Sequence, residues 1–260
     1  MRPKKELGQH FLTAPMIAKK IVGSISAAPE DHVLEIGPGK GALSVHLKNR
    51  FPHFHCVEVD RDLAAKLSEK LGPGDWVLHE CNALRFDFSI VGFPLHVVGN
   101  LPYSVGAMII KKTLLYGTNI LSCTFMVQRE VAQRIIASPH TKQNGFLSIF
   151  CQFFGQPRIL FHVPPGAFFP KPKIDSSVFN LTVRKDLVAR LPREAWENFF
   201  TFIDTGFKMR RKTLVNAMTR EGDKSAFIGM LEDLRIDPKV RPEDLGVDQW
   251  LSVYKRSCEQ

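Results

Sequence analysis

The sequence lacks a long apolar run, a closely spaced cysteine pair and any internal repeat. The absence of an apolar stretch of about 18 residues argues against a membrane-spanning helix, and the residues that follow Met1 lack the apolar core of a secretory signal. The five cysteines are scattered through 260 residues with no Cys-X-X-Cys pair, which favours reduced thiols in a cytoplasmic protein. No His-Glu-X-X-His spacing occurs either, so no metal site is expected.

Acidic residues are fewer than basic residues. The chain has 35 Lys and Arg against 26 Asp and Glu, which gives a formal net charge of +9. Such a surplus favours an anionic partner, with nucleic acid the first candidate. A local basic segment, Phe207–Arg220, carries five cations and no acid. Hydrophobic residues make up 44% of the chain, an ordinary value for a globular protein with a substantial core.

Strand-like and helical patterns alternate through the first half of the chain. Short apolar runs occur at residues 33–36, 55–59, 75–79, 95–98 and 123–127, with helical patterns between them. This alternation predicts βαβ units, a parallel sheet and therefore an α/β fold. Two closer segments, 158–163 and 177–183, predict an antiparallel hairpin at the edge of that sheet.

The pattern changes after Arg184, where helical segments are expected without strands between them. Pro192 and Pro242 stand at expected helix starts. The sequence therefore predicts two domains, an α/β domain over residues 1–187 and a small all-helical domain over residues 188–260. The helices expected in the second domain are 194–207, 212–218, 224–234 and 247–256.

A glycine-rich turn, Glu35–Ala42, follows the first expected strand and opens a helix. Glycines at this place permit a tight turn and let a ligand approach the backbone closely. Glu58 ends the next strand, where a carboxylate can accept the hydroxyls of a ribose. The spacing alone also fits a dinucleotide fingerprint. Glu35, placed where it could meet the ammonium group of a methionine moiety, favours S-adenosylmethionine over NAD.

A second constellation, Asn100-Leu101-Pro102-Tyr103, follows the fourth strand. The exocyclic amine of adenine is a poor nucleophile because its lone pair is delocalised into the ring. An amide oxygen of Asn100 and a main-chain carbonyl beside Pro102 can both accept its N–H bonds and so concentrate that lone pair. Proline restricts the residue before it to extended geometry, which helps to aim the carbonyl. Tyr103 can stack on the base, and catalysis then rests on positioning and dipole complementarity.

The chain resembles the small-subunit ribosomal RNA adenine dimethyltransferases, the KsgA/RsmA family, in motifs that run nearly from end to end. The proline-rich segment within Val163–Val178 and the Arg-Arg-Lys block at residues 210–212 distinguish this family from NAD enzymes, which have neither. The matching segments are Gly8–Leu12, Glu35–Gly41, Asn100–Tyr103, Phe125–Val131, Val163–Val178 and Phe207–Thr213.

This resemblance implies a Rossmann-like class I methyltransferase domain with a small C-terminal helical, RNA-binding domain. It implies that S-adenosylmethionine donates two methyl groups to N6 of each of two adjacent adenosines. Those adenosines lie in the 3′-terminal hairpin loop of 16S rRNA, within the immature 30S subunit. We therefore expect a cytoplasmic monomer that acts in ribosome biogenesis, without a membrane or metal partner.

The resemblance also assigns site residues by position. Two depart from the common pattern: His10 stands where the family often has Asn, and Asn82 stands where an Asp usually receives the adenine amine of the donor. A charge-assisted bond thereby becomes neutral, so we expect Asn82→Asp to tighten donor binding. The expected donor-binding residues are Gln9, His10, Leu12, Glu35, Gly37, Gly39, Gly41, Glu58, Asn82, Ala83 and Asn100.

Asn100, Leu101, Pro102, Tyr103 and Phe168 are the expected catalytic residues. Phe168 matches the family aromatic that sandwiches the target base against Tyr103, so we expect it to be exposed on a stiff, proline-flanked loop, whereas the neighbouring Phe169 is expected to belong to the core. The expected RNA-binding cations are Arg2, Lys4, Lys5, Lys208, Arg210, Arg211 and Lys212.

Three alternatives stay open at this point. The first is a related enzyme that acts on 23S rRNA and confers macrolide-type resistance, although the proline-rich segment and the Arg-Arg-Lys helix favour the 16S enzyme. The second is a ribosome-assembly factor whose binding outweighs its chemistry, in which case Asn100→Ala would retain the cellular role. The third and most distant is an NAD oxidoreductase, for which no acid–base pair is evident.

Overall fold

The computed structural model describes residues 9–28, 30–219 and 224–259 and divides the chain into two compact units. The first unit comprises residues 1–132 and 156–184, and the second comprises residues 133–155 and 185–260. The change of character predicted after Arg184 thus coincides with a border between units. The segment 133–155, which the sequence assigned to the first domain, groups with the C-terminal helices instead.

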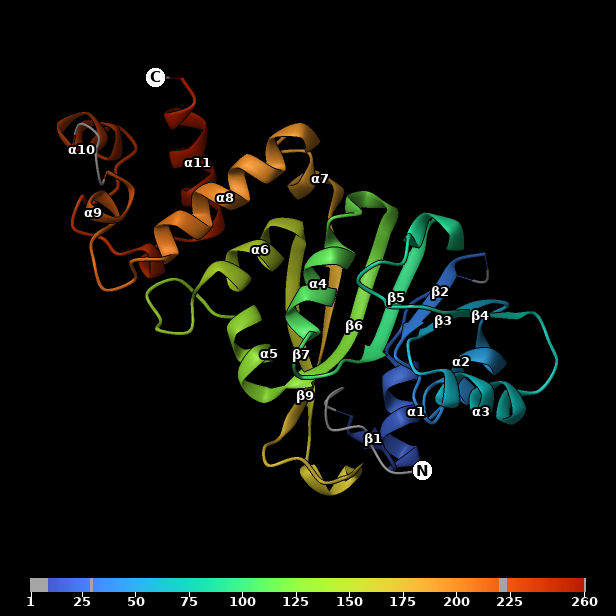
Figure 1. The fold of residues 1–260 in the computed structure, drawn as a ribbon. Coiled ribbons are helices and arrows are strands. Elements are labelled where there is room, and N and C mark those ends of the chain that lie inside the picture. Colours follow the sequence, from blue (N-terminus) through green and yellow to red (C-terminus); the bar gives the residue numbers. More distant parts are fainter. Residues whose placement is uncertain (1–8, 29, 220–223, 260) are drawn as a thin grey trace. The chain divides into compact units, whose positions relative to one another are not determined.

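A mixed sheet forms the centre of the first unit (Figure 1). Strands β2, β3, β4, β5 and β6 run parallel to one another, and β9 pairs antiparallel to β6. The α/β fold with a parallel sheet is confirmed, as is the pairing of the last two strands at one edge. Its seven strands lie in the order β4 (Trp76–Glu80), β3 (His53–Glu58), β2 (His32–Ile36), β5 (Leu95–Asn100), β6 (Ile120–Gln128), β9 (Ser176–Val183) and β7 (Gly155–Val163).

This strand order places a topological switch point beside β2. The chain runs outward from β2 to β3 and β4 and then returns to the other side of β2 as β5. Open α/β sheets bind ligands in the crevice that such a reversal leaves at the carboxyl ends of the strands. The turns after β2, β3 and β5 therefore meet where a ligand is expected.

Helices cover the sheet because alternate strand residues are apolar. Val33, Phe54 and Cys56 point to one face and join a core with Ile21, Leu47 and other helix residues. Asp60 caps the third helix through its carboxylate, which accepts from the N–H of Asp62 at 3.1 Å. The helices of this unit are α1 (Pro15–Gly23), α2 (Ser44–Arg50), α3 (Arg61–Leu71) and α4 (Gly106–Leu114), with 3-10 turns at Phe88–Val91, Gly117–Asn119 and Pro165–Ala167.

A small two-stranded sheet, absent from the sequence prediction, lies beside the main one. Strand β1 (Phe11–Leu12) pairs antiparallel with β8 (Phe168–Phe169), so that Phe11 faces Phe169 and Leu12 faces Phe168. The proline-rich loop is thereby fastened to the N-terminal segment. Thr13 adds two bonds to the carbonyl of Ala167, from its N–H at 2.8 Å and from its hydroxyl at 3.0 Å.

The second unit is helical, and aromatic packing explains why it includes the segment before β7. The ring centres of Phe150 and Phe200 lie 4.5 Å apart, and those of Phe153 and Trp196 lie 5.7 Å apart in an edge-on arrangement. Aromatic pairs of this kind add to the stability that burial supplies. The helices are α6 (Phe146–Phe154), α7 (Lys185–Val188), α8 (Trp196–Phe207), α9 (Leu214–Met218), α10 (Lys224–Asp233) and α11 (Val247–Ser257), with 3-10 turns at Arg193–Ala195 and Pro242–Asp244, while α5 (Arg129–Ile135) crosses the border between units.

Among the described residues, no helix combines the length and the apolar character that crossing a bilayer requires. The five cysteines are all free thiols.

Candidate donor and adenine site

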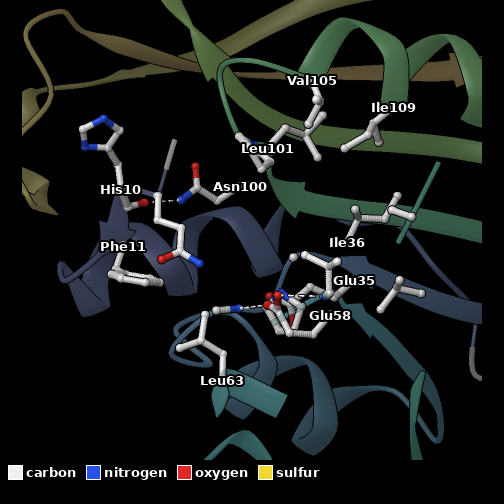
Figure 2. Close-up of a pocket in the computed structure, with 18 of the residues that line it drawn as sticks. His10, Phe11, Glu35, Ile36, Glu58, Leu63, Asn100, Leu101, Val105 and Ile109 are labelled. Atoms are coloured by element: carbon white, nitrogen blue, oxygen red, sulfur yellow. Dashed lines mark hydrogen bonds between the residues drawn. The ribbon is translucent and has the colours of Figure 1, made fainter. Parts of the chain in front are cut away.

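A cavity of about 240 Å³ opens at the carboxyl ends of β2, β3 and β5 (Figure 2). Its wall is formed by the turn after β2, the end of β3, the turn after β5 and the N-terminal segment from Gln9 to Leu12. The cavity therefore lies at the switch point of the sheet, and the two motifs that the sequence analysis singled out lie on opposite sides of it.

The glycine turn has the backbone conformation that its sequence predicts. Gly37, Gly39 and Gly41 all have positive φ, at 68°, 56° and 73°, a region that residues with a Cβ rarely adopt. Gly37 and Gly39 line the cavity, whereas Gly41 does not. A Cβ on Gly41 would lie 2.7 Å from Cδ1 of Leu67, so this glycine permits close packing against α3. The structure thus gives Gly41 a packing reason for being glycine, and its contact with the donor stays a prediction.

The carboxylate of Glu58 is held in place by backbone groups. Its Oε1 accepts from the N–H groups of Val59 at 2.9 Å and Asp60 at 3.0 Å, and its Oε2 accepts from the N–H of Gly39 at 3.0 Å. Burial raises the pKa of Glu58, and the three N–H bonds oppose that shift. A carboxylate offers about four acceptor positions. One position on Oε2 is thus left for a ligand hydroxyl.

Glu35, on the neighbouring strand, is also buried, but fewer hydrogen bonds within the described residues offset the cost of burying its carboxylate. It is 1% exposed, and its Oε2 accepts from the hydroxyl of Ser44 at 2.6 Å. Burial raises the pKa of Glu35 to about 8, and the bond from Ser44 offsets only part of that rise. A buried acid in this condition is suited to a cationic ligand group, because the added positive charge would favour the ionised form.

A hydrogen bond to the N-terminal segment orients Asn100. Its Nδ2 donates to the main-chain carbonyl of His10 at 2.8 Å (Figure 2). Because the amide nitrogen is engaged, the oxygen Oδ1 is the group left to accept from a ligand. The next carbonyl, that of Leu101, receives no backbone N–H among the described residues, although Pro102 O accepts from both Val105 and Gly106. Two acceptors therefore stand together where β5 ends.

Tyr103 completes this side of the cavity. Its hydroxyl is hydrogen bonded to Oγ of Ser176 at 2.8 Å, and its ring lies 5.2 Å from the imidazole of His10. His10 is fixed in turn, since its Nδ1 donates to the carbonyl of Pro170 at 2.7 Å. The Tyr103 ring is thus held at both ends and is half-buried.

The predicted site residues are largely brought together. Of the expected donor-binding residues, all except Gly41 line the cavity, and so do Asn100, Leu101, Pro102 and Tyr103. Asn82 is exposed, and its Oδ1 accepts from the N–H of Leu84 at 2.9 Å. The sequence analysis missed the apolar wall, for which the only available signal was adjacency to recognised motifs. That wall includes Phe11, Val59, Leu63, Val105 and Ile109.

The expectations for the two phenylalanines of the proline-rich loop are reversed. Phe168 is 4% exposed and belongs to the hydrophobic core, whereas Phe169 is 59% exposed. Strand pairing is the cause, because successive residues of β8 point to opposite sides. Leu12, the partner of Phe168 in the small sheet, belongs to the same core. In this structure Phe168 cannot stack on a base opposite Tyr103.

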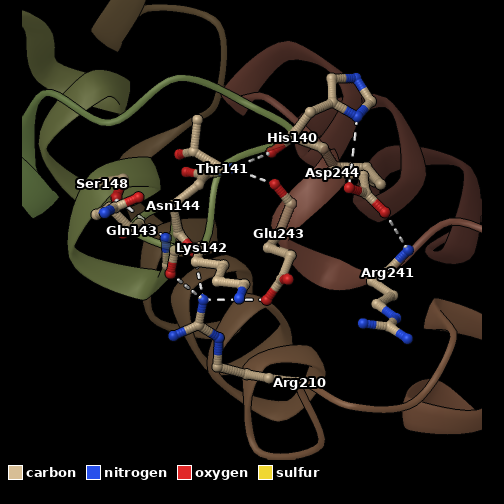
Figure 3. Close-up of polar contacts among 12 residues, drawn as sticks. His140, Thr141, Lys142, Gln143, Asn144, Ser148, Arg210, Arg241, Glu243 and Asp244 are labelled. Atoms are coloured by element: carbon tan, nitrogen blue, oxygen red, sulfur yellow. Dashed lines mark hydrogen bonds and ion pairs between the residues drawn. The ribbon is translucent and has the colours of Figure 1, made fainter.

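The basic segment of the second unit contains two kinds of cation. Arg210 donates from one guanidinium nitrogen to the carbonyls of Lys142 at 2.6 Å and Asn144 at 3.0 Å, and to Oε2 of Glu243 at 3.0 Å (Figure 3). It therefore closes the loop before α6 onto the turn before α11. Arg211 and Lys212 are exposed. Lys208 is also exposed and forms an ion pair with Asp204 at 3.5 Å. Arg2, Lys4 and Lys5 lie outside the described residues.

A family model, Ribosomal RNA adenine dimethylase, matches residues 1–258. The chain belongs to the ribosomal RNA adenine dimethylase family. The resemblance inferred from the motifs is thereby confirmed, and S-adenosylmethionine is the methyl donor of this family.

Individual relatives agree with this placement. The chain is 39% identical over 254 residues to the ribosomal RNA small subunit methyltransferase A of Aromatoleum aromaticum, covering 97% of this chain and 93% of that one. It is 39% identical over 258 residues to the protein of the same name from Acinetobacter baylyi, covering 97% and 91%.

Solved structures confirm the Rossmann-like methyltransferase fold of this family member. A dimethyladenosine transferase from Plasmodium falciparum superposes with a TM-score of 0.81 at 21% identity, covering 95% of this chain and 98% of that one. The 23S rRNA methyltransferase ErmE superposes with a TM-score of 0.73 at 23% identity, covering 95% and 98%. At these identities the likeness concerns the fold alone.

Proposed function

We propose that this protein transfers methyl groups from S-adenosylmethionine to N6 of two adjacent adenosines in the 3′-terminal hairpin loop of 16S rRNA. Its family and its relatives, named as small subunit methyltransferases, support this function over one on 23S rRNA. The observation that carries the proposal is the pair of acceptors at the end of β5, Asn100 Oδ1 and the Leu101 carbonyl, on the wall of the cavity.

The residues present fit this donor. The donor carries a ribose, an ammonium group and a methyl-bearing sulfonium, which supplies the activated methyl group when bound. Glu58 offers an acceptor position for a hydroxyl, and the under-compensated Glu35 suits a cation. Asn82, which lines the same cavity as the apolar Val59 and Leu63, would receive the adenine end.

The turn after β5 would make the target amine reactive. Before the first transfer, Asn100 Oδ1 and the Leu101 carbonyl would accept its two N–H bonds, which would draw the lone pair out of conjugation with the ring. N6 releases one proton for each methyl group that it gains, so one N–H bond is left to be accepted before the second transfer. The bond from Asn100 Nδ2 to His10 keeps the accepting oxygen in place before substrate arrives. Fixed dipoles of this kind cost no reorganisation during the reaction, and Tyr103 supplies a flat surface against the base.

The proposed substrate form is the 16S rRNA within the immature 30S subunit, met by a monomer in the cytoplasm during ribosome biogenesis. The test is to incubate the protein with labelled donor and 30S particles that lack the modification, and then to digest the rRNA to nucleosides. We expect N6,N6-dimethyladenosine at two adjacent positions of 16S rRNA. Label in 23S rRNA from 50S particles instead, or no label, contradicts the proposal.

Arg211 and Lys212 are the proposed phosphate contacts of the second unit, and Arg210 is a positioning residue for the loop around Lys142. Arg211→Ala with Lys212→Ala should weaken RNA binding and lower the slope of log K against log salt by about 1 to 2. The melting temperature and donor affinity should stay unchanged. Arg210→Ala should lower the melting temperature, since it removes three bonds.

A matched control replaces two exposed lysines of the same unit, Lys239→Ala with Lys255→Ala. It removes the same charge from other places, so its salt slope should stay near that of the wild type. Equal loss in the two double variants would mean that total charge, rather than this segment, determines RNA affinity.

A further inference from the structure

We propose that Phe169 with Lys40, Lys171 and Lys173 forms a binding surface for the RNA nucleotide next to the target adenosine. We call these four residues the rim surface. Phe169 would stack on the neighbouring base, and the lysines would meet the adjoining phosphates. This inference rests on the proposed function. The contact it assigns to Phe169, with the neighbouring base, differs from the contact with the target base that the sequence analysis expected of Phe168.

The register of the small sheet places Phe169 at the cavity. Phe11 lines the cavity and is the cross-strand partner of Phe169. Directly opposed residues of an antiparallel pair project to the same face. Phe169 thus stands beside the cavity wall on the side of Phe11, and it is not itself a lining residue. It can contact a nucleotide at the mouth but does not enter the pocket that holds the target base.

The ring is exposed on a backbone segment that is held in place. Phe169 is 59% exposed, although burying so large an apolar side chain would be favourable. Its backbone is fixed by pairing with β1, and the carbonyl of the next residue, Pro170, accepts from Nδ1 of His10 at 2.7 Å. A base could stack on this ring without first ordering a loop, so little conformational entropy would be lost.

One lysine lies near the ring, and two more follow it in the sequence. Nζ of Lys40 lies 4.8 Å from the centre of the Phe11 ring and 5.8 Å from that of Phe169. Lys171 and Lys173 follow Phe169 on the same loop, and both are exposed, as is Lys40. None of these lysines forms an ion pair within the described residues.

An aromatic platform bordered by cations is the usual composition of single-stranded nucleic acid sites. The occupant is the nucleotide adjacent to the target, because Asn100, Leu101 and Tyr103 inside the cavity already serve the target base. Two consecutive adenosines of the proposed substrate would then occupy the cavity and the rim surface together. Extruding one base unstacks its neighbour, and Phe169 would replace the lost stacking partner.

The test uses the full chain and unmodified 30S particles with Phe169→Ala, Phe169→Trp and Ile90→Ala. Ile90 is a matched control, since it is 60% exposed and does not line the cavity. We expect Phe169→Ala to raise KM for the particles by about 5- to 150-fold, the range given by one lost base stack. Phe169→Trp should restore KM to within about threefold of wild type, and Ile90→Ala should leave it unchanged.

Two further measurements separate stacking from a structural effect. Donor affinity by titration calorimetry and the melting temperature should be unchanged in Phe169→Ala. For the second measurement, 2-aminopurine replaces the nucleotide on the 5′ or the 3′ side of the target adenosines in 16S rRNA. Binding of the wild-type protein should quench the fluorescence of the probe at one of these two positions, and Phe169→Ala should lose that quenching. Lys171→Ala with Lys173→Ala should lower the salt slope by about 1 to 2.

A KM within twofold of wild type in Phe169→Ala overturns the inference, as does unaltered quenching in that variant. A loss of donor affinity or of melting temperature also overturns it, because the ring would then serve the fold. If the wild-type protein methylates no 30S particle, the proposed function itself has failed.

Discussion

Two strand-to-helix turns face each other across the cavity and present different kinds of groups. The turn after β2 has three glycines at positive φ. Beside it lie two buried carboxyl groups, Glu35 near the end of β2 and Glu58 at the end of β3. The turn after β5 has no residue at positive φ within Asn100–Tyr103 and presents acceptor oxygens, one from a side chain and one from the main chain. In the proposed function, the first turn binds the donor and the second acts on the amine.

The comparison also explains why one turn needs glycine and the other does not. At Gly39 a Cβ would lie 3.1 Å from the ring of Phe11, so a side chain would crowd the cavity wall. At Asn100 a side chain is required, because the accepting oxygen belongs to it. Binding and chemistry thus rest on separate turns, and substitutions should affect them separately.

The largest expected effect is on the β5 turn. Asn100→Ala removes an acceptor that is aimed at the amine, so kcat should fall by about 100- to 1,000-fold, as when one fixed hydrogen-bonding group is removed from an active site. Donor affinity, measured by calorimetry, should change far less than kcat. A fall of less than tenfold, or equal losses in kcat and donor affinity, would remove the distinction between the two turns.

An intermediate effect is expected at the end of β2. The pKa of Glu35 is raised to about 8 from 4.5, so the folded protein retains a proton that the unfolded chain loses above pH 4.5. The contribution of this proton to the free energy of unfolding is complete below pH 4.5. It is lost as the pH rises toward 8, by up to about 1.4 kcal/mol per pH unit.

The measurement compares the free energy of unfolding of wild type and Glu35→Gln at pH 6, 7 and 8. Glutamine cannot ionise, so the variant should gain stability relative to wild type as the pH rises. The difference between the two proteins cancels the titration of the histidines. A difference that does not depend on pH would show that Glu35 is ionised throughout this range.

The smallest effect is expected at Asn82, beside the cavity. Asn82→Asp should keep the bond from the N–H of Leu84 and add a charge toward the adenine amine of the donor. A charge-assisted bond exceeds a neutral one by about 1 kcal/mol, so the donor Kd should fall by about fivefold in calorimetry. Looser binding of the donor by the Asp variant would contradict this assignment.

Local patterns were sufficient for most of the central sheet. The apolar runs near Val33, Val57 and Val97 are confirmed as strands, because residues that alternate with helical segments have few other ways to bury an apolar face. The helix α6 was missed, although Phe146–Phe154 is strongly apolar, because nothing in a single segment shows which partner will cover it. The grouping of that segment with the C-terminal helices depends on Phe200 and Trp196, far away in the chain.

The sequence by itself determined the family, the parallel sheet and the glycine turn after its first strand, since each of these depends on residue types at short, regular spacings. Only the tertiary structure decided which of two similar neighbouring side chains is buried or hydrogen bonded and which is exposed to solvent. Pairing of β1 with β8 buries Phe168 and exposes Phe169, and a distant loop binds Arg210 while Arg211 stays in solvent. The reason is that burial and hydrogen bonding depend on partners more than a hundred residues away for the phenylalanines and more than sixty for Arg210.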